Sequence, residues 1–142
     1  MNIEAILNSK GGEVVTVRCD TKVAEAVGLL ADRRIGALPV MKDDEVAGIM
    51  SERDLVYCVA RDGAAVLDWP VERVMTSPIF TAEPKMPVLA GLSLMTERRV
   101  RHLPVVDAGR LVGLVSIGDL VKYRMDRIEE EAAALRDYIQ TA

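Results

Sequence analysis

Residues 14–55 read VVTVRCDTKVAEAVGLLADRRIGALPVMKDDEVAGIMSERDL, and residues 79–120 read IFTAEPKMPVLAGLSLMTERRVRHLPVVDAGRLVGLVSIGDL. The second stretch aligns with the first at an offset of 65 positions without a gap, and 12 of the 42 paired residues are identical. The identical residues of the first copy are Thr16, Val23, Leu29, Arg33, Arg34, Leu38, Pro39, Val40, Gly48, Ser51, Asp54 and Leu55. A repeat of this length is one supersecondary unit, which buries its apolar face by stacking on its copy. The sequence therefore predicts one domain made of two similar halves.

Each copy has the pattern strand, helix, strand, strand, helix. In the first copy, residues 14–17, 37–41 and 46–50 predict strands, and helices are expected to open at Thr21 and Ser51. In the second copy, residues 79–82, 102–106 and 111–115 predict strands, and helices are expected to open near Pro87 and at Ser116. Pro39 and Pro104 fall inside predicted strands, which favours small sheets in which both prolines lie on an edge or near a strand's start. The fold class is therefore α/β (α+β).

Composition excludes several classes of protein. A chain of 142 residues fits one domain, and its net charge of −4 argues against binding to nucleic acid. The longest uncharged run, residues 86–96, is too short to span a bilayer, and the first residues lack the pattern of a signal peptide, so a cytoplasmic protein is expected. Cys19 and Cys58 lack the spacing of a zinc or redox site and are expected to be core residues.

The last segment has no counterpart in the first copy. From Val121 onward, apolar residues recur at alternating intervals of four and three: Val121, Met125, Ile128, Ala132, Leu135 and Ile139. This narrow heptad seam favours a helix over residues 121–142 that pairs with a second copy of the chain, which predicts a homodimer. The alternative is a helix that folds back over its own domain.

Both copies contain the motif Gly-x-x-Ser-x-x-Asp-Leu, with Ser51 and Asp54 in the first and Ser116 and Asp119 in the second. A serine followed three residues later by a carboxylate at the start of a helix is a capping box, which needs no ligand. The same geometry suits a nucleoside phosphate, because the helix N-terminus attracts phosphate and an aspartate one turn later can accept from the ribose hydroxyls. The two interpretations are compatible.

This motif, preceded by 35-IGALPV-40 or 100-VRHLPV-105, resembles the CBS domain, named after cystathionine β-synthase. The resemblance covers both copies and implies a tandem pair, or Bateman module, whose halves meet through their small sheets around a pseudo-two-fold axis. It suggests a first repeat at 10–62, a linker at 63–76, a second repeat at 77–125 and a C-terminal helix at 121–142. Members of this family typically bind AMP, ATP, NAD or S-adenosylmethionine between the repeats and often form dimers.

The resemblance also assigns roles to residues. Asp54 and Asp119 match the ribose-binding position, Ser51 and Ser116 the hydroxyl near the phosphate, and the segments Val14-Val15 and Ile79-Phe80 the lining of the adenine. Arg101 and His102 fall where phosphate-binding residues often occur, whereas the first repeat has Gly36 and Ala37 there. The cleft of Asp119 is therefore expected to be the better equipped one, and the cleft of Asp54 to be empty, weaker or served by Arg53.

Other residues have structural interpretations. The pairs Arg33-Arg34 and Arg98-Arg99 suit helix C-termini, Trp69 suits a linker anchor, and the lone histidine, His102, is either a ligand contact or a partly exposed strand residue.

The favoured function is a non-catalytic sensor that binds AMP, ADP, ATP or NAD and signals to an unidentified partner protein. The alternative is a dimerisation or interaction module with vestigial clefts. An enzyme is not expected, because the sequence shows no nucleophile beside a base, no metal ligand set and no catalytic cofactor motif.

Overall fold

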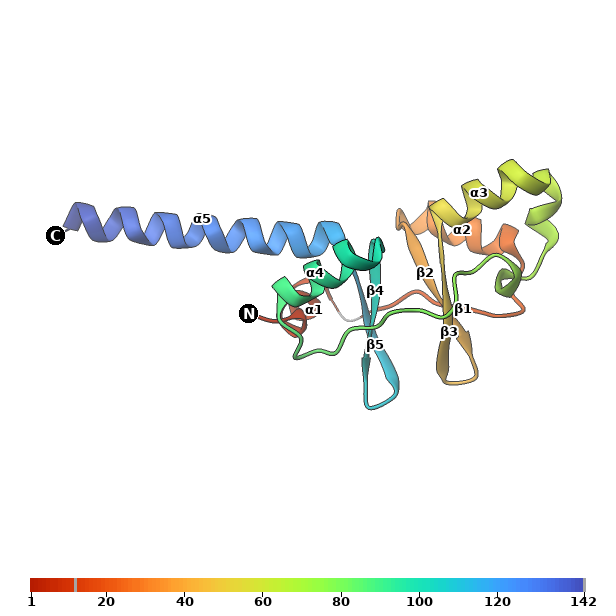
Figure 1. The fold of residues 1–142 in the computed structure, drawn as a ribbon, viewed down its shortest axis with the longest axis horizontal. Helices are drawn as coiled ribbons and strands as arrows, with labels where there is room; N and C mark the ends of the chain where they lie inside the picture. Colours follow the sequence, from red (N-terminus) through yellow and green to blue (C-terminus); the bar gives the residue numbers. More distant parts are fainter. Residues whose placement is uncertain (12, 142) are drawn as a thin grey trace.

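The computed structural model describes residues 1–11 and 13–141, which form two similar lobes and a projecting helix (Figure 1). The first lobe contains β1 (Val17–Arg18), α2 (Val23–Arg33), β2 (Ala37–Lys42), β3 (Glu45–Ser51) and α3 (Glu52–Asp62). The second contains α4 (Val88–Arg98), β4 (His102–Asp107), β5 (Arg110–Ser116) and α5 (Ile117–Thr141). Helix α1 (Ile3–Lys10) precedes the first lobe, and the short 3-10 helices η1 (Gly63–Asp68) and η2 (Val71–Arg73) lie between the two sets of elements.

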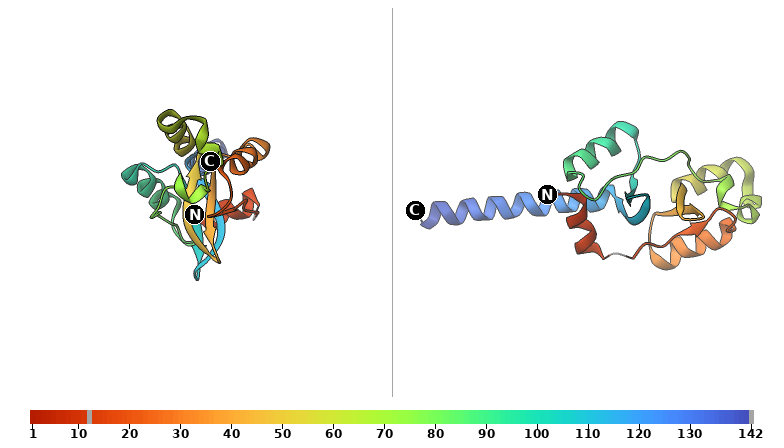
Figure 2. Two further views of the ribbon diagram at one scale, coloured as in Figure 1. Left: turned by 90° about the vertical axis from the view of Figure 1, so that its right-hand side faces the viewer. Right: turned by 90° about the horizontal axis from the view of Figure 1, so that it is seen from below.

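Each lobe is built on an antiparallel hairpin. In β2–β3, Ala37 is paired with Ser51 and the register shifts between Val40 and Met41, and β4–β5 repeats this pattern, with a shift between Val105 and Val106. The two hairpins lie side by side at the centre of the molecule, where β3 contacts β5 (Figures 1 and 2). The predicted fold class, with two repeats packed through small sheets, is confirmed.

The prolines are accommodated where the ladders leave room for them. Pro39 lies in β2, the middle strand of a three-stranded sheet, but β1 pairs only with Val40 and Met41, so its flank on that side is open. In the second lobe, Ala82 donates to the carbonyl of Pro104 and accepts from the amide of Val106, so the missing N–H of proline is not needed. Proline thus avoids a lost ladder bond without occupying a strict edge strand.

The predicted first strands of the two repeats are shorter than expected. Of the segment 14–17, only Val17 lies in a strand, which continues to Arg18, and the segment 79–82 contributes a single bridge between Ala82 and Val105. The β-branched composition of these segments indicates an extended chain, but ladder partners are present only near their ends.

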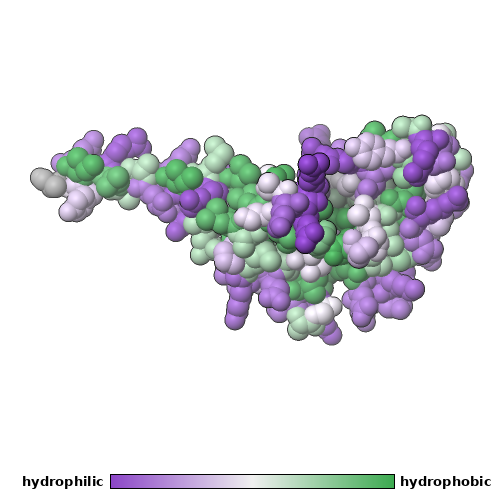
Figure 3. Space-filling view, in the orientation of Figure 1, coloured by the Kyte–Doolittle hydropathy of each residue, from purple (hydrophilic) through white to green (hydrophobic). Residues whose placement is uncertain are grey.

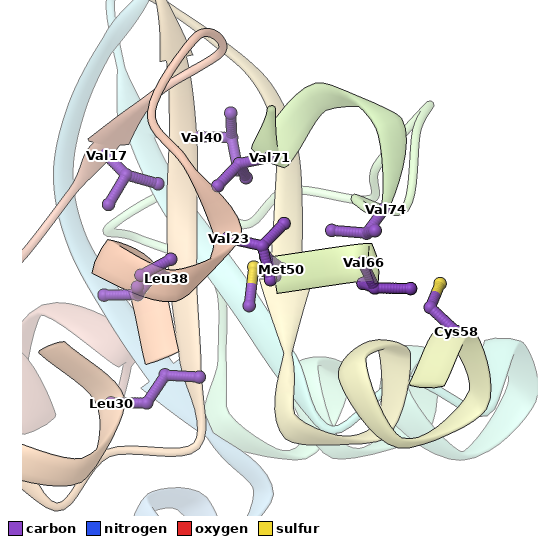
Figure 4. Packing of buried hydrophobic residues seen from close by; sticks show 11 residues of the cluster. Val17, Val23, Leu30, Leu38, Val40, Met50, Cys58, Val66, Val71 and Val74 are labelled. Atoms are coloured by element: carbon purple, nitrogen blue, oxygen red, sulfur yellow. The ribbon is translucent and has the colours of Figure 1, made fainter. Parts of the chain in front are cut away.

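The core of each lobe is completed by residues from a segment outside its own repeat. Val66, Val71 and Val74, from the segment between the repeats, complete the core of the first lobe (Figure 4). Helix α1, which precedes the first repeat, instead contributes Ile3, Ile6 and Leu7 to the core of the second lobe. The two lobes therefore exchange segments, which ties them into one unit. The predicted repeat boundaries stay predictions, but residues 63–76 do more than connect.

Gly48 and Gly113, the glycines of the repeated motif, lie where a segment from outside the repeat crosses a strand. We call α1 and residues 63–76 the crossing segments. A Cβ atom added to Gly48 would lie 2.6 Å from the sulfur of Met75 and 2.8 Å from the carbonyl oxygen of Thr76. A Cβ atom on Gly113 would collide with the side chain of Leu7 in α1. Each glycine therefore lets the crossing segment pack directly on a strand.

The helix ends, the cysteines, Trp69 and the C-terminal helix also agree with the sequence predictions. Arg34 and Arg99 cap α2 and α4 in the left-handed conformation, which confirms the predicted helix ends. Cys58 is buried in the first core, and Cys19 and Trp69 are partly buried against it, as expected. The predicted C-terminal helix is present to Thr141, and Ala142 lies outside the described residues.

Candidate functional site

Both Ser-x-x-Asp motifs form capping boxes. Ser51 N donates to Asp54 Oδ2 over 2.9 Å, and Asp54 N donates to Ser51 Oγ over 3.2 Å. At the start of α5, Ser116 N donates to Asp119 Oδ2 over 2.9 Å, and Asp119 N donates to Ser116 Oγ over 3.1 Å. Capping is therefore confirmed for both, and each carboxylate keeps further acceptor positions for other partners.

Asp54 faces a cleft of about 450 Å³ between the lobes, within the range of small-molecule sites. The first repeat supplies one wall, and the other comes from the start of the second repeat and from the turn between α4 and β4. The lining residues are Gly36, Ile49, Ser51, Glu52, Arg53, Asp54, Thr76, Pro78, Ile79, Phe80, Arg98, Arg99, Val100, Arg101, His102 and Pro104. The predicted residues Ser51, Arg53, Asp54, Ile79, Phe80, Arg101 and His102 thus line one cleft.

Four arginines make this cleft electropositive. Arg53, Arg98, Arg99 and Arg101 line it against two acidic residues, Glu52 and Asp54. The Arg98 guanidinium lies over the Phe80 ring, 4.9 Å from the ring centroid, in a cation–π contact. The cleft therefore offers an aromatic surface next to several donors for an anion.

The expectation that Arg101 and His102 serve the cleft of Asp119 is wrong, because the cleft that they line contains Asp54. The backbone of Arg101 does lie beside Asp119's helix, since its carbonyl accepts from the amide of Ile117. Its side chain, however, lines the cleft between the lobes. Membership of the same repeat as Asp119 therefore does not decide which cleft a side chain enters, because a cleft forms between the two repeats.

Sequence reasoning also missed Arg98 and Arg99 as cleft residues, because their position at a helix end already explained them. The signal available was their proximity in sequence to Arg101, which makes three arginines in four residues. Thr76 was missed as well, because it lies in a segment that sequence reasoning treated as a linker.

His102 lies between the lobes and is partly buried. Burial is the main reason that its pKa is lowered, and the charge of Lys10 adds to this effect, while Asp119 and Glu52 oppose it and Arg101 lowers it slightly further. His102 is therefore mostly neutral near pH 7, where it can donate or accept a hydrogen bond without adding charge. Gly36 makes space for it, since a Cβ there would lie 3.3 Å from His102 Nε2.

Asp54 has one contact beyond its capping box. Thr76 Oγ1 donates to Asp54 Oδ1 over 2.9 Å, and Ser51 Oγ lies 3.0 Å from Asp54 Oδ2. With the Ser51 amide, these contacts use three of the roughly four acceptor positions of a carboxylate. At least one position is left for a hydroxyl in the cleft, and Thr76 can release a second by rotating its own hydroxyl.

Asp119 is engaged differently. Lys10 Nζ, at the end of α1, lies 2.7 Å from Asp119 Oδ2 and also donates to the carbonyl of Leu114 over 3.0 Å. Burial alone would raise the pKa of Asp119, but the hydrogen bonds from Lys10 and Ser116 outweigh it, and the pKa is lowered. Asp119 is therefore a paired carboxylate, and it lies outside the lining of the Asp54 cleft.

The segment Val14-Val15 is not brought to Asp119 in a common hollow. Val14 lines a shallow depression with Thr16, Met41, Asp43, Asp44 and Arg110, near the turns of the two hairpins, and Val15 packs against the first core. Its predicted adenine role stays a prediction without geometric support.

The family model of the CBS domain matches residues 4–61 and again residues 71–126. The chain belongs to the CBS domain family. It is 34% identical over 147 aligned residues to the mitochondrial CBS domain-containing protein CBSX3 of Arabidopsis thaliana, covering 97% of this chain and 71% of that protein.

Solved structures of CBS proteins share this fold. The CBS-domain protein ATU1752 of Agrobacterium tumefaciens is 42% identical, with a TM-score of 0.84, over 87% of this chain and 99% of that one. The CBS domain pair of protein MJ0100, solved with 5'-methylthioadenosine and S-adenosyl-L-methionine, is 23% identical, with a TM-score of 0.79, over 89% of this chain and 98% of that one.

Among residues 1–11 and 13–141, the side chains of His, Cys, Asp and Glu nowhere gather in a group of three that could hold a metal ion. Within the same residues, we find no helix with the length and apolar character needed to cross a membrane.

Proposed function

We propose that this CBS pair is a non-catalytic regulatory module that binds one adenosine nucleotide per chain in the cleft of Asp54. The observation that carries the proposal is the joint position of Asp54, Phe80 and four arginines around one cleft. In this assignment Asp54 accepts from the ribose, Ile79 and Phe80 lie against the adenine, and the arginines meet the phosphates. The MJ0100 pair was crystallised with two adenosine derivatives, which supports an adenosine-containing ligand.

Charge narrows the ligand class. The excess of arginine over carboxylate in the cleft favours AMP, ADP, ATP or NAD over a cationic ligand such as S-adenosylmethionine. A hydrogen bond between a charged donor and a phosphate contributes about 1.5–3 kcal/mol. Affinity should therefore rise from adenosine to its phosphorylated forms.

The surroundings of Asp119 support a stoichiometry of one ligand per chain. Lys10 already neutralises Asp119, and the repeat offset places Gly36 and Gly118 where the first cleft has Arg101 and Arg53. An anionic nucleotide would thus meet fewer cations there and a carboxylate that already has a partner.

We further propose that the module acts as a homodimer and passes its bound state to a partner protein. A ligand shifts a conformational equilibrium only through different affinities for two states, and a ligand bound between the lobes contacts both of them. The relative placement of the lobes, and of α5 with the second lobe, is the natural output.

The test is calorimetric titration with adenosine, AMP, ADP, ATP and NAD. We expect about one ligand per chain and tighter binding of the phosphorylated ligands, by roughly tenfold or more. The double variant Arg98→Gln/Arg101→Gln should lose this preference but still bind adenosine. The matched control is Arg110→Gln, which alters an exposed arginine at the start of β5 and should bind as the wild type does.

A second candidate function is a ligand-independent interaction module, which the Lys10–Asp119 contact favours because one of the two motif aspartates is already paired within the chain. This candidate predicts that no member of the nucleotide panel raises the melting temperature. A ligand at 100 times its Kd would stabilise the fold by about 2.7 kcal/mol, so a true ligand would be visible.

A further inference from the structure

We propose that α5 pairs in parallel and in register with α5 of a second copy of this chain, and that two kinds of ion pair between the helices fix this register. The inference rests on the homodimer part of the proposed function and adds the surface, direction and register of the contact. It does not depend on nucleotide binding.

An apolar seam along α5 is open to solvent. The helix has 25 residues, about 37 Å of length, and most of it projects beyond the second lobe (Figure 1). The large seam residues Val121, Met125, Ile128, Leu135 and Ile139 have exposed fractions between 40% and 65%. Figure 3 shows apolar residues along this projecting helix among charged ones. Most of the stability of a helix in a protein comes from packing of its apolar face, so a helix with an uncovered seam gains stability from a partner.

The chain's own lobe does not cover the seam. Leu120 is fully buried and Tyr123 packs against the second core, so these residues define the side of α5 that faces the protein. At about 100° per residue, the centre of the seam lies roughly 100° around the helix from Leu120. The seam thus faces sideways, where a second helix can lie along it.

The charges beside the seam favour a parallel arrangement. In a parallel coiled coil, the residue before each a position faces the residue after a d position five places later in the partner helix. With Met125, Ala132 and Ile139 at a, this rule places Arg124 opposite Glu129 of the partner subunit and Glu131 opposite Arg136 of the partner subunit. Both pairs are attractive, and two-fold symmetry produces each of them twice.

The antiparallel arrangement with full overlap is unfavourable. There, equivalent flanking positions face each other, so Glu129 meets Glu129 of the partner subunit and Glu131 meets Glu131 of the partner subunit. Lys122 would also face Arg136 of the partner subunit. Shifting the helices by one heptad removes these repulsions but also removes seam layers. Only the parallel arrangement keeps both the full seam and the attractive charges.

Charge exchange tests the register. Glu131→Arg and Arg136→Glu should each weaken the dimer by about tenfold, because each converts two attractive contacts into repulsive ones. The double variant should return to within about twofold of the wild type, because it restores opposite charges. Sedimentation equilibrium of the full chain at low salt measures the dimer Kd. A double variant as weak as either single variant would overturn the parallel register.

Cysteine crosslinking tests the surface directly. In the proposed dimer, Ile128 faces Ile128 of the partner subunit, so Ile128→Cys should form an intersubunit disulfide under mild oxidation. The matched control Glu130→Cys, on the opposite side of α5, should not, and the wild type controls for Cys19 and Cys58. A dimer without the Ile128→Cys crosslink would refute the helix pairing but leave the proposed homodimer intact. A monomer at all concentrations would refute both, while calorimetry would still report nucleotide binding separately.

Discussion

The two motif aspartates occupy equivalent positions of the repeats, and they offer a matched pair of substitutions. Asp54 lines the cleft and accepts from Ser51 and Thr76, whereas Asp119 is paired with Lys10. We expect Asp54→Asn to weaken nucleotide binding and Asp119→Asn to leave it unchanged. Both substitutions preserve side-chain size and leave an amide oxygen that can still accept in the capping box.

The size of the effect follows from the hydrogen bonds. In Asp54→Asn, the amide oxygen is expected to stay with Ser51 and its NH₂ group to face Thr76, which can then accept. A ribose hydroxyl therefore loses a charged acceptor, and the difference between a charged and a neutral hydrogen bond is about 1–1.5 kcal/mol. Nucleotide Kd should accordingly rise by about tenfold.

Calorimetric titration of the two variants with the tightest ligand of the panel is the assay. Melting curves should accompany it, since weaker capping costs either variant up to about 1 kcal/mol of stability and the titration must be run well below both transitions. Equal loss of affinity in both variants, or a larger loss in Asp119→Asn, would refute the assignment of the site to the Asp54 cleft.

Three further outcomes are expected. Lys10→Met should lower stability by about 1 kcal/mol, since its ion pair is only partly buried. The difference should shrink as the pH falls below about 4 toward the folded pKa of Asp119, which lies below its usual value, and a difference that stays constant between about pH 5 and pH 2 contradicts this origin. Burial lowers the pKa of His102, so the fold loses stability as the pH falls below the unfolded pKa of 6.5. His102→Asn should therefore flatten the decline in melting temperature between about pH 7 and pH 5. Parallel melting curves for the variant and the wild type would contradict this explanation. Gly113→Ala should lower the free energy of unfolding by about 1–3 kcal/mol, because the added methyl group meets Leu7 of α1. Gly28→Ala, which has open space around it in α2, should raise it by up to about 1 kcal/mol. Urea titrations measure both, and equal effects would be inconsistent with the proposed packing.

The fold could be predicted because its signals are local and appear twice. The strand ends, the capping boxes and the αL caps at Arg34 and Arg99 depend on residues a few positions apart, and each pattern is repeated 65 residues later. A motif that appears in both copies is far stronger evidence than either copy alone. The helix boundaries and the lobe architecture follow from such patterns.

The exchange of segments between the lobes could not be predicted in this way. Lys10 and Leu7 contact residues of the second lobe more than a hundred positions later, and neither position belongs to the repeat that was aligned. Helix α1 places Ile3, Ile6 and Leu7 on one face, but an apolar face on a short helix gives no sign of which lobe it joins. For the same reason, the cleft that Arg101 enters depends on how the sheets pack, which the sequence of one repeat does not contain.

The difference between the surroundings of the two motif aspartates arises in these unaligned segments. Extending the 65-residue offset backwards pairs Lys10 with Met75 and Gly11 with Thr76. At one motif the crossing segment therefore delivers a threonine hydroxyl to Asp54, and at the other it delivers a lysine ammonium to Asp119. A hydroxyl can rotate and let the carboxylate accept from a ligand, whereas an ammonium 2.7 Å away neutralises the carboxylate and fills the space beside it. One duplicated frame can thus hold one aspartate that lines a cleft and another that is paired within the chain, because the residues that differ lie outside the repeated motif.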